Sequence, residues 1–318
     1  MLELAERFGR YRTYGQHERI ELEIGRGLQP RHDSIMNFIR TGGLRRAHED
    51  AATLSARTAY FREEYGYGDR IYAPGIEAFL HNEGLLAAAR QIHGRPVVEP
   101  AIAYANLMVP GQELAVHTDV PEFRGANRKV FPQWLLVVML HSGLFDAWRL
   151  HIATGIAWFH DSDHGALAYW PDGPDAPVRH HRIRANTALV LDTDSVFHGV
   201  DRVTDDRAEV VPPVRPTTVL EPRDGRWVLV ADDGDGPEVA SYAFDELRFS
   251  VSWKAYCFAD EIDRDRWRDG TDGLDLPTVL EALVDDLRER GVTTDGPHDP
   301  SLGRTLIDTY IRFPALTA

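Results

Sequence analysis

A succession of short apolar segments between Arg95 and Phe258 constrains the fold of this chain more than any other feature. Clusters of proline, glycine, aspartate and asparagine separate the segments, which are rich in aliphatic and aromatic residues. Many short strands divided by turns, with no crossover helix between them, favour a sandwich, jelly roll or barrel over a parallel α/β sheet. The predicted strands are Ala101–Val109, Glu113–His117, Trp134–Leu140, Ile156–His160, Ala166–Trp170, Val178–Arg182, Thr187–Asp192, Arg226–Ala231 and Leu247–Phe258.

The regions on either side have a helical pattern. Before residue 95, apolar residues recur at three- and four-residue spacing, which predicts helices over Asp33–Arg40, Glu49–Tyr65 and Gly75–Ile92. After residue 258, Pro277 suits the first turn of a helix whose buried stripe would run from Leu280 to Leu287. The simplest account is one domain over residues 1–318, with mainly helical parts at 1–94 and 259–318 around a β core at 95–258.

The composition limits the possible partners. With 50 acidic and 35 basic residues, the formal net charge is -15, which disfavours nucleic acid and anionic membranes as partners. Hydrophobic residues make up 43% of the chain, enough for a substantial core. Only two basic residues, Lys129 and Lys254, are lysines, and this arginine bias indicates a high-GC, bacterial source.

A single cysteine, Cys257, excludes an intramolecular disulfide and a thiolate metal cluster within one chain. It lies in an apolar run and is expected to be a buried, unreactive thiol. The sequence has no apolar signal core near its start and no run approaching the ~18 residues of a membrane span. We therefore expect a cytoplasmic protein.

A histidine and a carboxylate two residues apart can bind one metal ion if they lie on a strand, where alternate residues point to the same side. From the composition, about two H-x-D/E pairs are expected by chance. Three occur, beginning at His48, His81 and His117. The first two fall in helical segments, where residues two apart diverge, so only His117 and Asp119 combine the spacing with a strand. His198, after the apolar segment that begins at Thr187, is a candidate third ligand for a two-histidine, one-carboxylate iron site.

Four segments in order make residues 104–202 resemble the iron(II)/2-oxoglutarate oxygenases, in particular their prolyl-hydroxylase-like branch. The segments are Pro110–Asp119, Gly165–Pro171, Thr187–Asp194 and Phe197–Val200. They match, respectively, the turn into the H-x-D strand, a G-x-L segment ending at proline, the strand before the distal histidine, and that histidine with its neighbours. The resemblance implies a double-stranded β-helix (jelly-roll or cupin-like) core in an α+β fold. It also implies Fe(II), 2-oxoglutarate and O2 as cofactor and co-substrates, with His117, Asp119 and His198 as the iron ligands.

The resemblance also implies an arginine that binds the distal carboxylate of 2-oxoglutarate. Arg248 and Ser250 match the family's R-x-S/T pair, and Arg248, Ser250, Ser252 and Lys254 alternate with apolar residues, as on a strand with one polar face. Arg248 lies fifty residues after His198, which is farther than usual in the family, so residues 205–245 would be an insertion, either a lid or a peripheral addition.

Three further residues remain as alternative or additional co-substrate contacts. Arg207 lies at the usual distance from the distal histidine and stays an alternative to Arg248 as the anchor. Tyr104 and Asn106 precede the H-x-D turn on one face of a strand, where related proteins contact the co-substrate.

The activity implied is oxidation of an unactivated C–H bond by hydroxylation, desaturation or cyclisation. Arg124, Arg128 and Lys129 follow the H-x-D strand and could hold an acidic group of the substrate. We expect a small, amino-acid-like metabolite of specialised biosynthesis, and we leave the oligomeric state open. The alternatives are a cupin-type metal enzyme that does not use 2-oxoglutarate and a non-catalytic β-helix binding module.

Overall fold

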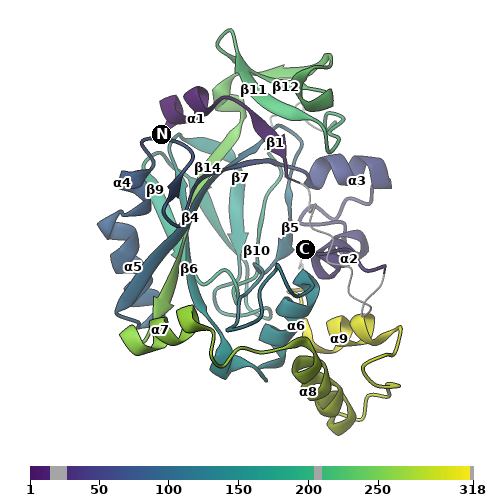
Figure 1. Ribbon diagram of the computed structural model, residues 1–318. Helices are drawn as coiled ribbons and strands as arrows, with labels where there is room; N and C mark the ends of the chain where they lie inside the picture. Colours follow the sequence, from purple (N-terminus) through teal and green to yellow (C-terminus); the bar gives the residue numbers. More distant parts are fainter. Residues whose placement is uncertain (15–26, 204–209, 316–318) are drawn as a thin grey trace.

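The computed structural model describes residues 1–14, 27–203 and 210–315. Its strands form two antiparallel sheets (Figure 1). The larger sheet has ten strands in the order β13-β12-β11-β1-β2-β4-β14-β6-β9, with β3 paired to β2, and the smaller has the order β5-β10-β7-β8. The strand bounds are β1 Tyr11–Thr13, β2 Phe61–Tyr67, β3 Arg70–Ile71, β4 Val97–Met108, β5 Leu114–His117, β6 His151–Trp158, β7 Ser162–Tyr169, β8 Arg179–Ile183, β9 Thr187–Leu191, β10 His198–Val200, β11 Val219–Arg223, β12 Arg226–Val230, β13 Glu238–Tyr242 and β14 Arg248–Phe258.

Apolar side chains of both sheets pack together between them. Met108 and Trp158 of the larger sheet join Leu167 and Val200 of the smaller one in a single buried cluster. Along the chain, β5 lies in the smaller sheet, β6 in the larger, β7 and β8 in the smaller, β9 in the larger and β10 in the smaller. This alternation between two facing antiparallel sheets is the double-stranded β-helix, so the predicted fold class is confirmed.

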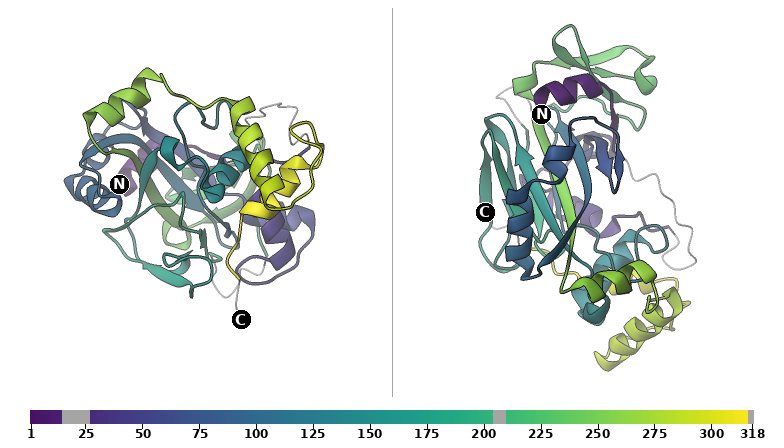
Figure 2. Two further views of the ribbon diagram at one scale, coloured as in Figure 1. Left: turned by 90° about the horizontal axis from the view of Figure 1, so that it is seen from below. Right: turned by 60° about the vertical axis from the view of Figure 1, so that its left-hand side comes forward.

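Helices cover the outer face of the larger sheet and one end of the molecule (Figures 1 and 2). On the outer face, Leu85 and Ala89 pack against the same apolar cluster as Trp253, whose indole donates a hydrogen bond to the Leu80 carbonyl. The helix bounds are α1 Leu2–Phe8, α2 His32–Thr41, α3 Ala51–Thr58, α4 Glu77–Leu80, α5 Glu83–His93, α6 Gln133–Ser142, α7 Glu261–Asp269, α8 Leu276–Glu289 and α9 Leu302–Tyr310, with 3-10 turns at Asp146–Trp148, Asp232–Gly234 and Phe244–Glu246. None of the helices in the described ranges is long and apolar enough to cross a membrane.

The predicted helix over Glu49–Tyr65 is wrong in its second half. Helix α3 begins after Asp50, whose side chain accepts a hydrogen bond from the Thr53 amide, and it ends at Thr58. Phe61 and Tyr65 lie instead on β2, which pairs with β4, and both are fully buried. Residues four apart share a face in a strand as well as in a helix, so their spacing did not distinguish the two. The first 94 residues therefore contribute strands β1 to β3 as well as helices.

The other predicted helices fit more closely. Asp33–Arg40 corresponds to α2, and Gly75–Ile92 corresponds to α4 and α5, which are separated at Asn82 because its side chain caps the start of α5.

The predicted strand over Trp134–Leu140 is a helix, α6. Every residue from Gln133 to Met139 is buried, because α6 packs on all sides, including against α8 and α9. A helix buried on all sides has a continuous apolar sequence, which a buried strand also has. A helix therefore does lie between β5 and β6, contrary to the prediction that none interrupts the strands, although the sheets remain antiparallel.

The segment predicted as an insertion adds strands to the edge of the larger sheet. The expected hairpin is present: β12 pairs with β13, and β11 joins both to β1. Val211 and Val214, which precede β11, pack into the apolar cluster on the outer face of the larger sheet. No residue from 210 to 247 lines the central cavity, so the described part of this segment is a peripheral addition and not a lid.

Candidate metal centre

A cavity of about 930 Å³ lies between the two sheets. Strand β14 contributes Arg248, Ser250, Ser252 and Lys254 to its lining, because alternate side chains of a strand point to one face. The apolar residues between them pack in the core on the opposite side. The predicted polar face of this strand is thus a wall of the cavity.

His117, Asp119 and His198 meet at this cavity. Strands β5 and β10 pair with His198 opposite His117, and the two ring centroids are 4.4 Å apart. Asp119 Oδ1 lies 3.6 Å from His117 Nε2 and 3.8 Å from His198 Nε2. Within the described ranges, these residues are the one group of three histidine, cysteine or acidic side chains whose ligand atoms all lie within 4.8 Å of one another.

Backbone contacts orient both imidazoles. His117 Nδ1 is 2.7 Å from the Ala115 carbonyl oxygen, and His198 Nδ1 is 2.9 Å from that of Val196. A carbonyl oxygen can only accept, so Nδ1 carries the proton and Nε2 keeps its lone pair for a metal. Burial and the adjacent His117 lower the pKa of His198 to about 4, so this ring is neutral at pH 7.

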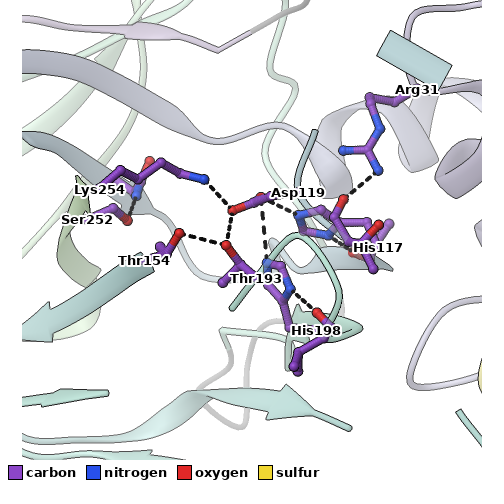
Figure 3. Close-up of polar contacts among 12 residues, drawn as sticks. Arg31, His117, Asp119, Thr154, Thr193, His198, Ser252 and Lys254 are labelled. Atoms are coloured by element: carbon purple, nitrogen blue, oxygen red, sulfur yellow. Dashed lines mark hydrogen bonds and ion pairs between the residues drawn. The ribbon is translucent and has the colours of Figure 1, made fainter. Parts of the chain in front are cut away.

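Asp119 presents one carboxylate oxygen to the histidines and has protein partners on the other (Figure 3). Its Oδ2 accepts hydrogen bonds from Thr193 Oγ1 at 2.6 Å and Lys254 Nζ at 2.8 Å. Thr193 in turn contacts the Thr154 hydroxyl at 2.7 Å. Burial by itself would raise the pKa of Asp119, but the Lys254 ammonium holds that pKa well below its usual value. The carboxylate is therefore ionised and its orientation is fixed.

The donor set fits iron(II). Two imidazoles and one carboxylate that converge from one side form the facial arrangement found in non-haem iron oxygenases, which leaves further coordination positions open. Each ligand is held by a second contact, as is typical of built metal sites. Arg31 adds support, because its guanidinium pairs with Asp33 and donates to the Thr118 carbonyl between the two β5-side ligands.

Arg248 is buried in the cavity wall without an acidic partner among the described residues. It is 3% exposed, and its guanidinium donates to the Gly165 carbonyl at 2.8 Å and to Ser250 Oγ at 3.1 Å. Burial lowers the pKa of Arg248 to about 10, so it stays charged at pH 7. A buried charge without a counter-ion is costly, and an anion entering the cavity would compensate it. The alternative anchor, Arg207, lies outside the described residues.

Two glycines in the segments that resemble the oxygenases allow neighbouring atoms to come close to the backbone at this site. Gly165 has φ +67°, and a Cβ there would lie 2.8 Å from Arg248 Cδ. A Cβ on Gly199 would lie 2.8 Å from the Leu114 carbonyl oxygen, against the strand that carries His117. Glycine is thus required beside both the arginine and the distal histidine.

The other predicted contacts are divided between the cavity and the scaffold. Tyr104 and Asn106 both line the cavity, and Asn106 Nδ2 donates to Ser252 Oγ at 3.0 Å. Arg128 and Lys129 line it as well. Arg124 does not, because it is buried and binds Asp272 and the Ala147 carbonyl, which makes it a structural residue.

Three residues at the site were missed as functional by sequence reasoning. Lys254 was assigned only to a polar face, and its contact with Asp119 joins positions 135 residues apart. Thr193 follows a predicted strand. Arg62 lines the cavity from β2, a segment that was predicted as helix. No local pattern marks any of these contacts.

Comparison with known proteins gives partial matches in structure only. No protein-family model and no curated protein matches the chain. An oxidoreductase of the 2OG-Fe(II) oxygenase family from Burkholderia pseudomallei matches with 10% identity and a TM-score of 0.33, over 62% of this chain and 65% of the other. A prolyl-4-hydroxylase from Pseudomonas putida (14%, TM-score 0.28, 62% and 71%) and HygX from Streptomyces hygroscopicus, with nickel and 2-oxoglutarate bound (11%, TM-score 0.33, 62% and 70%), also match. The chain spans slightly less than two thirds of the first of these structures.

Proposed function

We propose that this protein is an Fe(II)/2-oxoglutarate-dependent oxygenase, a single domain over residues 1–318, that oxidises an unactivated C–H bond of a small, amino-acid-like metabolite. Hydroxylation and oxidative cyclisation in specialised biosynthesis are the outcomes we favour. One observation carries the proposal: the same cavity contains three convergent metal ligands and, separately, the buried and uncompensated guanidinium of Arg248.

Each group would have a distinct role. His117, Asp119 and His198 would hold iron(II) through two Nε2 atoms and Asp119 Oδ1, while Lys254 and Thr193 keep the second oxygen of Asp119 turned away. Arg248 and Ser250 would bind the distal carboxylate of 2-oxoglutarate, since a guanidinium offers paired donors that match a carboxylate. When bound, iron and 2-oxoglutarate supply the oxidising power, with molecular oxygen as the oxidant and succinate and carbon dioxide as co-products.

Arg248 also separates this proposal from the first alternative. A cupin-type metal enzyme that does not use 2-oxoglutarate needs the three ligands but has no use for a buried, unpaired arginine facing the metal cavity. A non-catalytic binding module, the second alternative, needs neither, so the complete and oriented ligand set argues against it.

The test is an anaerobic titration of the purified protein with iron(II) and then 2-oxoglutarate, followed by visible absorption. We expect a weak charge-transfer band that requires both additions. His198→Ala should abolish the band through loss of iron, and Arg248→Ala should retain iron while weakening 2-oxoglutarate binding by about 10- to 100-fold. Iron binding without any band would favour the cupin-type alternative, and no iron binding would favour the binding module.

A further inference from the structure

We propose that Arg62 and Arg128 form an anion-binding subsite that holds a carboxylate, or an equivalent anionic group, of the substrate. This inference rests on the proposed function, because it assigns a role to the part of the cavity that the iron ligands and Arg248 do not use. Both arginines line the cavity.

Arg62 is held by stacking, and no described residue accepts a hydrogen bond from its guanidinium. On β2 it lies opposite Asn106 of β4, which lies opposite Ser250 of β14, so the three side chains share the cavity face of the sheet. Its Cζ atom is 3.5 Å from the centre of the Tyr104 ring and 4.8 Å from that of Tyr14. Stacking covers the faces of a guanidinium, whereas its N–H groups point outward in the plane.

Neither arginine has a carboxylate partner among the described residues. Three carboxylates lie nearby. Glu63 pairs with Arg12, and the Glu122 carboxylate accepts a hydrogen bond from Tyr256 at 2.9 Å without coming within ion-pair distance of Arg128. Glu64 is exposed and lines the cavity near Arg62, but it forms no ion pair with either arginine. In a chain with a net charge of -15, two arginines that line one cavity without an ion pair among the described residues are a local exception, and a bound anion would compensate their charge.

This subsite is separate from Arg248. Arg248 lies two strands across the sheet and two residues along from the row of Arg62, a backbone separation of roughly 12 Å from ordinary strand spacing. The side chains also diverge, because Arg248 bonds to Gly165 on the smaller sheet whereas Arg62 stacks on Tyr104. The cavity can therefore hold two anions at once. A planar carboxylate matches the paired donors of Arg248, and it equally matches those of Arg62 and Arg128.

The experiment uses sulfate as a probe, titrated at constant ionic strength by calorimetry into the anaerobic protein loaded with iron(II) and saturating 2-oxoglutarate. We expect saturable binding to the wild type that is about tenfold weaker in Arg62→Gln and in Arg128→Gln. Arg226→Gln is the control, since it removes one arginine charge on β12, outside the cavity lining, and should change sulfate affinity by less than about twofold.

The visible chelate band serves as the folding control and separates the two proposals. If the band is intact in Arg62→Gln and Arg128→Gln but sulfate binds as in the wild type, or if the wild type shows no saturable sulfate binding, the subsite is overturned while the proposed function stands. Arg248→Gln loaded with iron(II) should show no band when 2-oxoglutarate is added, and it should still bind sulfate. Loss of the band in the wild type would instead overturn the proposed function.

Discussion

The cavity has a metal side, with the candidate ligands His117, Asp119 and His198, and an arginine side, with Arg248 and Arg62. Buried charge is paired on the metal side and unpaired, among the described residues, on the arginine side. At the metal side, the Asp119 carboxylate is matched by Lys254 and hydrogen-bonded by Thr193. At the other side, Arg248 and Arg62 have donors but form no ion pair within the described part of the chain. Compensated charges preorganise a site, whereas uncompensated ones show where a charged ligand from outside completes it. His198 differs from both, because a buried imidazole can avoid charge by losing its proton and an arginine cannot.

The largest effect is expected from replacing two buried arginines, Arg248 and Arg202. Among the residues that the structure describes, Arg202 has an acidic partner and Arg248 has none. Arg202 donates to Glu113 at 2.9 Å, and Glu113 is 1% exposed. Arg202→Met should lower the free energy of unfolding by about 3 kcal/mol, because it leaves the Glu113 carboxyl buried without its counter-charge. Arg248→Met should leave that free energy unchanged or raise it by about 1 kcal/mol, since it removes an uncompensated charge.

Denaturant unfolding of both variants without metal or 2-oxoglutarate provides the measurement. Equal destabilisation by the two substitutions would contradict the distinction between paired and unpaired charge. Arg248→Met should at the same time fail to bind 2-oxoglutarate, so stability and ligand binding would change in different directions.

A smaller effect concerns a histidine that stays neutral. His141 stacks on Phe197, and burial lowers its pKa to about 4, below the ordinary 6.5. In the unfolded chain this imidazole takes up a proton as the pH falls through 6.5, whereas in the folded chain it does not until about pH 4. His141 therefore lowers stability progressively between these values, and full stability is present above pH 6.5.

His141→Phe should remove that loss. At pH 5 the variant should gain up to about 2 kcal/mol relative to its difference from the wild type at pH 7. Urea unfolding of both proteins at the two pH values tests this, and a difference that does not change with pH would show that the folded protein protonates His141 normally.

The smallest effect is expected at Thr193, whose hydroxyl donates a hydrogen bond to Asp119 on the metal side of the cavity. Thr193→Val keeps the shape but removes the 2.6 Å hydrogen bond to Asp119 Oδ2, leaving Lys254 as the remaining side-chain partner of that oxygen. We expect iron(II) affinity to fall about tenfold. Competition with a chelator measures this, and Thr305→Val, on a helix far from the cavity, is the control. Unchanged affinity would mean that Lys254 alone orients the carboxylate.

Much of the site follows from local patterns that hold for one element at a time. The H-x-D pair could be placed because a strand puts alternate residues on one side, and the same rule identified the polar face from Arg248 to Lys254. The rule failed at Trp134–Leu140, because a fully buried element loses its periodicity whether it is a helix or a strand. It failed at Phe61 and Tyr65 because a spacing of four suits both.

The sequence by itself thus predicted the candidate ligands, the strands on or next to which they lie, and the arginine with its serine. Only the tertiary structure decided which charges are paired. Lys254 pairs with Asp119 and Glu113 with Arg202, whereas Arg62 and Arg128 line the cavity without an ion pair among the described residues. These contacts depend on the register between strands and on loops that approach from distant parts of the chain. Periodicity states which face a side chain is on, but the partner across the cavity is fixed only when the sheets close on each other.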